Sequence, residues 1–302
     1  MKFPHRAAGV VLTSVALLGL TVLAAGPALA KDKGGHHGNV IYSSLVTDPK
    51  PANLPSQAFQ AQQTSEFGNQ ITFAGTKRTL GHVDVTMSSW GCEAGTWFAN
   101  NCVTTPGSGF TEPITFNIYN ALAPGSTLPG SLIASVTKTF TIPFRPSASA
   151  QCTGGQLGEW YDTKSASCYN GFANNITFNF ANVVVPNSVV YGIAYNTTSY
   201  GSTPYGTSAA CFTTAQGCGY DSLNVGLSQD PTNMSVGTND NTGKVFWNTQ
   251  TAASYCDHGT AGSGIFRLDS PSPTAPCWNV NTAVAPPWYV PAVQFKTGGG
   301  KG

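Results

Sequence analysis

Charged residues are scarce in this chain. Lys, Arg, Asp and Glu together make up 9% of its 302 residues, and the formal net charge is +1. Binding to nucleic acid or to an anionic membrane depends on dense positive charge, so this composition argues against both partners. Solubility must therefore come from uncharged polar residues, which are abundant along the whole sequence.

Helical periodicity is also missing. Outside residues 1–30, no window keeps an apolar period of 3.6 residues for three turns, which excludes a helical bundle. Apolar and polar residues alternate instead, as in Ile114–Tyr119 and Ile176–Phe180, and this pattern is typical of β-strands. The other candidate strands are 71–75, 79–89, 132–144, 189–195, 223–227, 245–248, 265–269 and 289–295. Ten to twelve short strands with Gly, Pro and Asn turns predict an all-β, antiparallel, jelly-roll-like sandwich.

One candidate strand carries a charge on its apolar face. Even-numbered positions of residues 132–144 are apolar, except for Lys138. A lysine in such a row indicates a β-bulge or the edge of a sheet.

Residues 1–30 have the features of a cleavable signal peptide. Lys2 and Arg6 precede an apolar stretch, and Ala28-Leu29-Ala30 is a small-x-small cleavage site. We therefore expect a secreted, extracellular protein that leaves the membrane once the signal is cleaved. We further expect a flexible tail (31–39), a single β-sandwich domain (40–295) and a disordered C-terminus (296–302).

Eight cysteines follow the signal, and they form four close couples. Proximity predicts disulfides Cys92–Cys102, Cys152–Cys168, Cys211–Cys218 and Cys256–Cys277. Each bond would close a loop on the sandwich, and four bonds imply an oxidising compartment. No C-x-x-C pair is present, which argues against both a redox motif and a structural zinc site.

Several sequence segments resemble a family of uncharacterised secreted bacterial β-sandwich proteins. They include SQAFQAQQTSEFGNQITFAGTKRTL (56–80), VTMSSWGC (85–92), PGSLIASVTKTFTIPFRPSA (129–148) and VVYGIAYNT (189–197). The resemblance also covers NITFNF (175–180), YDSLNVGLS (220–228), VFWNT (245–249) and YVPAVQF (289–295). It implies a single disulfide-stapled sandwich and an exported protein, and it brings no assigned reaction.

Aromatic residues near the cysteines are the candidate binding residues. Trp97 lies within the first cysteine couple, Trp160 and Tyr161 lie within the second, and Trp288 precedes the last strand. Exposed rings on an exported β-sandwich can stack on the C–H face of a sugar. The simpler interpretation is that these rings cap the ends of the core.

Candidate catalytic constellations are weaker. His82 and Asp84 share one face of a strand, but that face is polar and is expected to face solvent. Asp257 precedes His258, but adjacent strand residues point apart, and no G-x-S-x-G motif supplies a nucleophile. A glycosidase needs two facing carboxylates, and spacing pairs none of the glutamates at 66, 93, 112 and 159. We therefore predict no catalytic residue.

Calcium is the one cofactor that the sequence suggests. Asp230, Asn233, Asn239, Asp240 and Asn241 concentrate oxygen ligands in one segment, although their spacing differs from that of an EF-hand. An ordinary turn explains the same residues.

The sequence thus favours a secreted, non-enzymatic β-sandwich that binds extracellular or cell-wall carbohydrate. The alternatives are a secreted carboxylate-dependent hydrolase and an inert structural component of the envelope or matrix. The ligand and the oligomeric state stay open.

Overall fold

The computed structural model describes residues 38–46, 54–59, 62–97, 99–195, 223–230, 234–240, 243–269 and 288–298. The predicted signal peptide lies outside these residues, and so do Cys211, Cys218 and Cys277. Within the described residues the chain forms sixteen β-strands and two short 3-10 turns, Gly154–Gln156 and Ala252–Ser254.

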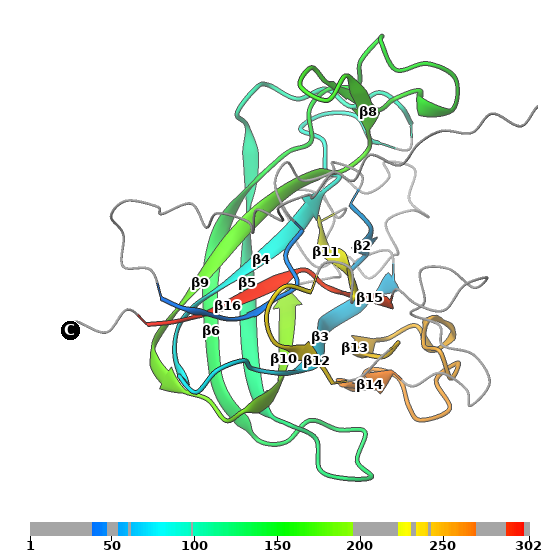
Figure 1. The fold of residues 1–302 in the computed structure, drawn as a ribbon. Helices are drawn as coiled ribbons and strands as arrows, with labels where there is room; N and C mark the ends of the chain where they lie inside the picture. The colour runs from blue at the N-terminus through cyan, green and yellow to red at the C-terminus, as the bar shows by residue number, and fades with distance from the viewer. Residues whose placement is uncertain are drawn as a thin grey trace, which may run out of the picture. The chain divides into compact units, whose positions relative to one another are not determined.

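Two seven-stranded antiparallel sheets contain most of these strands (Figure 1). Sheet A contains β1 (Val40–Ser43), β2 (Ser56–Gln57), β4 (Thr79–Ser89), β9 (Phe172–Val184), β11 (Leu223–Asp230), β15 (Trp288–Pro291) and β16 (Val293–Thr297). Sheet B contains β3 (Thr64–Thr72), β5 (Gly109–Asn120), β6 (Leu132–Pro143), β10 (Ser188–Tyr195), β12 (Thr238–Asn239), β13 (Val245–Thr249) and β14 (Arg267–Asp269). A separate hairpin consists of β7 (Trp160–Asp162) and β8 (Ser167–Tyr169).

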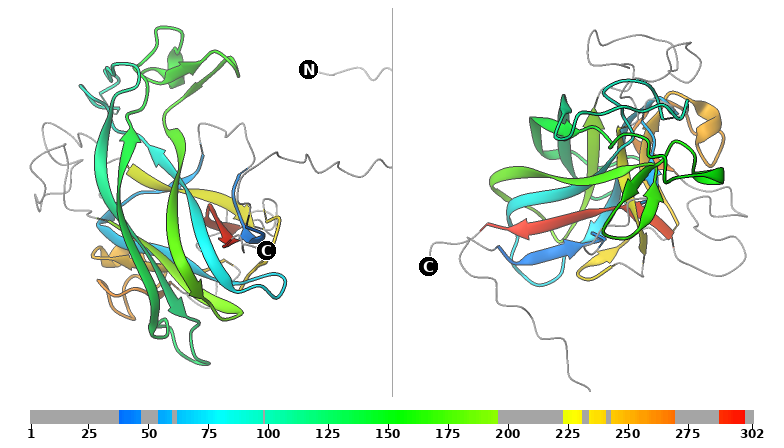
Figure 2. Two further views of the ribbon diagram at one scale, coloured as in Figure 1. Left: turned by 90° about the vertical axis from the view of Figure 1, so that its left-hand side faces the viewer. Right: turned by 90° about the horizontal axis from the view of Figure 1, so that it is seen from above.

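Some neighbouring strands lie far apart in the sequence. In sheet A the order is β1–β16–β4, with β9 also paired to β4, and in sheet B it is β14–β13–β3–β10–β5–β6. Figure 2 shows the curved β5–β6 pair facing β4 and β9 across the interior. This interleaving of early and late strands confirms the predicted all-β, jelly-roll-like sandwich.

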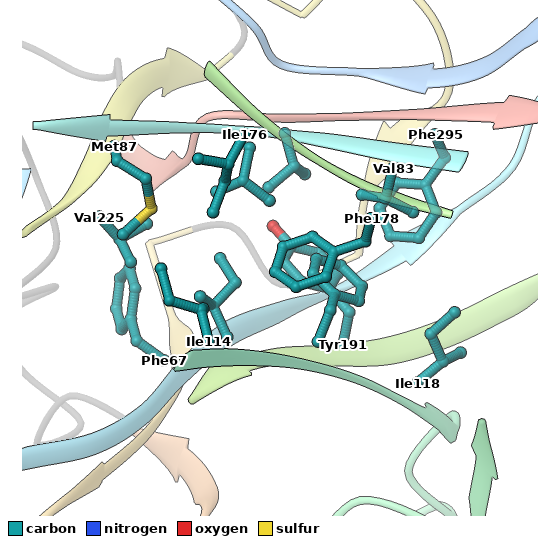
Figure 3. Packing of buried hydrophobic residues seen from close by; sticks show 14 of the residues in the cluster. Phe67, Val83, Met87, Ile114, Ile118, Ile176, Phe178, Tyr191, Val225 and Phe295 are labelled. Atoms are coloured by element: carbon teal, nitrogen blue, oxygen red, sulfur yellow. The ribbon is translucent and has the colours of Figure 1, made fainter. Parts of the chain in front are cut away.

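The core lies between the two sheets and is rich in aromatic rings. Phe116 of sheet B stacks on Tyr191 with a centroid separation of 5.6 Å, and it meets Phe178 of sheet A at 5.4 Å. Phe295 contacts Tyr191 at 5.5 Å, and Figure 3 shows how Phe178, Tyr191 and Phe295 converge. Such pairs contribute about 0.5–1.5 kcal/mol each beyond their buried area, so they fasten the sheets together.

Lys138 lies on an edge strand, as its position in the apolar row predicted. β6 ends the strand order of sheet B, and the Lys138 ammonium donates to the Thr177 carbonyl of β9 at 3.3 Å. The alternative of a bulge at this residue is wrong, because the irregularity in the β5–β6 pairing falls between Ile118 and Tyr119.

Two strands are longer than the sequence pattern predicted. β5 and β9 contain 12 and 13 residues, whereas the alternation indicated only Ile114–Tyr119 and Ile176–Phe180. β6, at Leu132–Pro143, agrees closely with the predicted strand 132–144. The last predicted strand is divided at Ala292 into β15 and β16, and β16 ends at Thr297 rather than at residue 295.

The structure contains two of the expected disulfides, Cys92–Cys102 and Cys152–Cys168. Cys256 is also disulfide-bonded, while Cys211, Cys218 and Cys277 lie outside the described residues. The bonds indicate an oxidising, non-cytoplasmic compartment. The part of the chain that the structure describes has no helix with the length and hydropathy of a membrane span.

Candidate functional site

A cleft of about 720 Å³ lies where the two disulfide-closed loops meet the segment that follows β6. Its lining is uncharged and combines aromatic rings, prolines and small residues. The aromatic and proline members are Pro106, Pro143, Phe144, Pro146, Trp160, Tyr161 and Phe172. In Figure 1 the hairpin strand β8 lies beyond the upper ends of β5 and β9, which places this region at the end of the sandwich.

The first wall of the cleft is the loop from residue 92 to residue 108. The Cys92–Cys102 bond closes the loop, and reciprocal backbone hydrogen bonds join Ala94 and Val103. Glu93 accepts hydrogen bonds from the Thr105 amide at 2.5 Å and from the Ser108 hydroxyl at 3.0 Å. These bonds, chiefly that from the Thr105 N–H, lower the pKa of the Glu93 carboxyl.

The second wall is the segment from 143 to 150, which binds to both loops. The Ala148 amide donates to the Cys102 carbonyl, and the Ser149 amide donates to the Glu159 carbonyl. Ser147 donates to the Thr104 carbonyl and accepts from the Thr104 amide. Pro143 and Pro146 restrict the backbone on either side of Phe144, so the wall is extended and stiff.

The third wall is the hairpin β7–β8, and Trp160 anchors it. The Trp160 ring is 8% exposed, and its indole N–H donates to the Gly171 carbonyl at 3.0 Å. Its centroid lies 5.5 Å from that of Tyr169 and 5.6 Å from that of Phe172. Trp160 thus caps the end of the core while one part of it lines the cleft.

Tyr161 is the most available of the predicted binding residues. It lines the cleft and is half-buried, and its hydroxyl makes no hydrogen bond with any described residue. A tyrosine that offers a ring face and an unused hydroxyl can both stack on a ligand and hydrogen-bond to it.

The other two predicted rings lie elsewhere. Trp97 is half-buried in the first loop and packs edge-on against Trp90 at 5.2 Å, and it does not line the cleft. Trp288 begins β15, and its side chain lies outside the described part of the structure. The structure therefore brings Trp160 and Tyr161 together and leaves Trp97 apart.

A buried arginine and a buried glutamate belong to the segments that line the cleft. Arg145 is fully buried and donates to the Gly158 carbonyl at 2.5 Å, while its Nε and Nη1 have no partner among the described residues. Burial lowers the Arg145 pKa to about 10, and burial raises the Glu159 pKa despite the attraction of Arg145. Neither residue lines the cleft, and the hydrogen bond from Arg145 to Gly158 joins the segment after β6 to the second disulfide-closed loop.

The candidate catalytic pairs His82/Asp84 and Asp257/His258 contain aspartates that bind other residues of the fold. Asp84 accepts from the Thr177 hydroxyl at 2.6 Å and from Lys296 at 3.1 Å, and burial, together with Lys296, lowers the pKa of His82. Asp257 pairs with Arg267 at 2.8 Å rather than with His258.

The predicted calcium segment is likewise occupied by hydrogen bonds. Asp230 accepts from Asn239 at 3.2 Å, and Asp240 accepts from the Thr72 and Ser188 hydroxyls at 2.9 and 2.6 Å. Asn233 and Asn241 lie outside the described residues, among which no group of three His, Cys, Asp or Glu side chains could hold a metal.

Sequence reasoning missed Phe144 and Phe172 as lining residues. Phe144 follows the end of β6, and Phe172 begins β9. Alternation assigned Phe144 to the apolar face of the strand predicted at 132–144, while Phe172 lay outside every predicted strand. The one usable signal was the pair of prolines around Phe144, which indicates an extended segment outside a sheet.

No family model, curated protein or solved structure matches this chain. The resemblance to secreted bacterial β-sandwich proteins is thus supported at the level of fold alone, a two-sheet sandwich with two disulfides.

Proposed function

We propose that the protein is a secreted, non-enzymatic binding module for an uncharged extracellular or cell-wall carbohydrate, with the cleft as its ligand site. The observation that carries this proposal is the shared lining. Trp160, Tyr161, Phe144 and Phe172 come from three segments and border one cleft without a charged neighbour in its lining. A sugar ring offers apolar C–H faces and hydroxyls, which match aromatic rings surrounded by Ser and Thr.

The arrangement of the carboxylates favours binding over hydrolysis. None of the described carboxylates lines the cleft, and those on the segments that line it have other partners. Glu93 binds Thr105 and Ser108, Asp162 binds Ser165, and Glu159 accepts from Asn170 at 2.9 Å. A glycosidase would need two carboxyl groups that face each other across the sugar.

Retention on insoluble polysaccharides tests this function. The purified protein is incubated with cellulose, xylan, chitin and peptidoglycan, and the bound fraction is measured. We expect retention on at least one of them, a loss of roughly tenfold for Tyr161→Ala, and near wild-type binding for Tyr161→Phe, because a ring stack contributes about 1 kcal/mol or more.

Three outcomes would contradict the proposal. If the protein is retained on none of the polysaccharides, the carbohydrate hypothesis is wrong and an inert structural component is favoured. Retention that Tyr161→Ala leaves unchanged places the ligand outside the cleft. Release of soluble sugar during incubation would instead favour the hydrolase.

A further inference from the structure

Glu66 lies on the outer face of sheet B, away from the cleft. Side chains alternate along a strand, so the core position of Phe67 places Glu66 on the opposite face of β3. Its paired neighbours are Asn248 on β13 and Ala194 on β10. Glu66 is nevertheless only 9% exposed, which is unusual for a carboxylate on the outer face of a sheet.

Two donors from β5 fix one oxygen of the carboxylate. The Asn117 amide and the Tyr119 hydroxyl each donate to Glu66 Oε1 at 2.9 Å. Asn117 is itself oriented by Ser135 of β6, whose hydroxyl donates to Asn117 Oδ1 at 2.7 Å. The network thus runs across β3, β5 and β6, and all of its members stand on strands.

A glycine makes room for this crossing. The Glu66 side chain passes over Gly192 of β10 to reach β5, and a Cβ at Gly192 would lie 2.0 Å from Oε1. Gly68, the cross-strand partner of Gly192, also lacks a side chain. Gly192 therefore leaves the hollow in which the carboxylate lies, while a Cβ at Gly68 would meet the backbone of Tyr191.

Among the described residues, the Glu66 carboxylate has no counter-ion. No Lys, Arg or His in the described structure forms an ion pair with Glu66, and Oε2 receives no hydrogen bond there. The adjacent Asn248 Oδ1 is buried and also lacks a partner among these residues. Burial raises the pKa of the Glu66 carboxyl against the opposing effect of Asn117 and Tyr119. Two neighbouring acceptors thus lack donors.

Aromatic rings border the same place. Tyr119 packs against Phe266 with centroids 5.6 Å apart, and Phe266 packs against Phe246 at the same distance. Rings beside an uncompensated carboxylate favour an organic cation, because a ring face attracts positive charge and the carboxylate neutralises it.

We propose that Glu66, Asn248 and the Tyr119–Phe266 rings form a second binding site for a ligand that carries a primary ammonium group. An ammonium ion brings only donors, and the two unmet positions are both acceptors. A hydroxyl is a poorer match, since it presents an acceptor of its own. This site is independent of the cleft and of the proposed carbohydrate function.

Three matched sugars test the proposal in titration calorimetry. Glucosamine carries the ammonium group at a pH where its amine is protonated, whereas glucose and N-acetylglucosamine have similar shape without the charge. We expect glucosamine to bind at least tenfold more tightly than the other two. Its affinity should rise with pH as Glu66 ionises, and then fall as the amine loses its proton.

The isosteric variant Glu66→Gln separates this site from the cleft. It should reduce glucosamine affinity at least tenfold, while Tyr161→Ala leaves that affinity unchanged. Equal binding of the three sugars to the wild type, or glucosamine binding that survives Glu66→Gln, would overturn the proposal. The comparison of sugars on the wild-type protein stands even where a variant folds poorly.

Discussion

The cleft and the outer face of sheet B position their side chains in different ways. The cleft residues stand on loops, on the short hairpin β7–β8 and at the ends of β6 and β9. The loops and the hairpin depend on Cys92–Cys102, Cys152–Cys168 and a few backbone hydrogen bonds. Glu66 and its partners stand on paired strands, where the sheet itself fixes their spacing. The comparison teaches that one fold can hold one set of side chains in place with disulfide bonds and another set with the sheet alone.

Two glutamates of sheet B extend the comparison to its two faces. Glu66 lies outside with two donors, whereas Glu112 of β5 lies inside with the core residues Phe110 and Ile114. Glu112 is 3% exposed, and its Oε1 has no partner among the described residues. Burial alone raises its pKa to about 7.

The largest expected effect comes from removing a disulfide bond. The double variant Cys152→Ala/Cys168→Ala opens a loop whose ends are 16 residues apart, and such a bond contributes about 3 kcal/mol. We expect polysaccharide retention to disappear and glucosamine binding to persist, because the hairpin β7–β8 lines only the cleft. Chemical denaturation and the two binding assays measure this. Joint loss of both activities, with the sheet signal in circular dichroism intact, would break the distinction between the sites.

The second effect concerns pH and Glu112. The pKa of Glu112 is higher in the folded protein than in the unfolded chain. Between about pH 4.5 and 7, Glu112 is therefore ionised in the unfolded chain while it is still protonated in the folded protein. The free energy of unfolding should therefore decrease as pH rises, by up to about 3 kcal/mol from this group.

Glu112→Gln removes that titration, and Glu66→Gln is its matched control. Urea unfolding across this pH range should show a flatter profile for Glu112→Gln than for the wild type. Glu66→Gln should flatten the profile less, because Asn117 and Tyr119 already stabilise the ionised carboxylate. Identical profiles for wild type and Glu112→Gln would show that Glu112 reaches solvent in the folded state.

Much of the sandwich follows from the sequence, because each long strand has one buried face. The alternation around Phe116 and Phe178 identified two strands that meet in the core. Close cysteines likewise indicated two bonds, since short loops bring their ends together. Lys138 marked an edge because a buried strand would leave its charge without solvent.

The Glu66 site could not be predicted, for two physical reasons. The sequence predicted a strand at 71–75, but most of β3 lies before it. The polar side chains at 66, 69 and 70 interrupt the alternation of apolar and polar residues, so this part of the strand was not recognised. The partners of Glu66 also lie far away in sequence, with Asn117 51 residues along the chain. Only part of the cleft was predicted. Trp160 and Tyr161 lie within a cysteine couple, whereas Phe144 was assigned to a predicted strand and Phe172 to no element.

The smallest expected effect tests the hollow beneath Glu66. Gly192→Ala adds one methyl group where a Cβ would lie 2.0 Å from Oε1, so the carboxylate must move from Asn117 and Tyr119. Glu66 can rotate toward solvent, so we expect a stability loss of only about 1 kcal/mol. Glucosamine affinity should fall severalfold without any change in charge. Gly155→Ala is the matched control, because nothing lies within 4 Å of its Cβ. If Gly192→Ala binds glucosamine as the wild type does, the position of the carboxylate does not matter, and the site depends on charge alone.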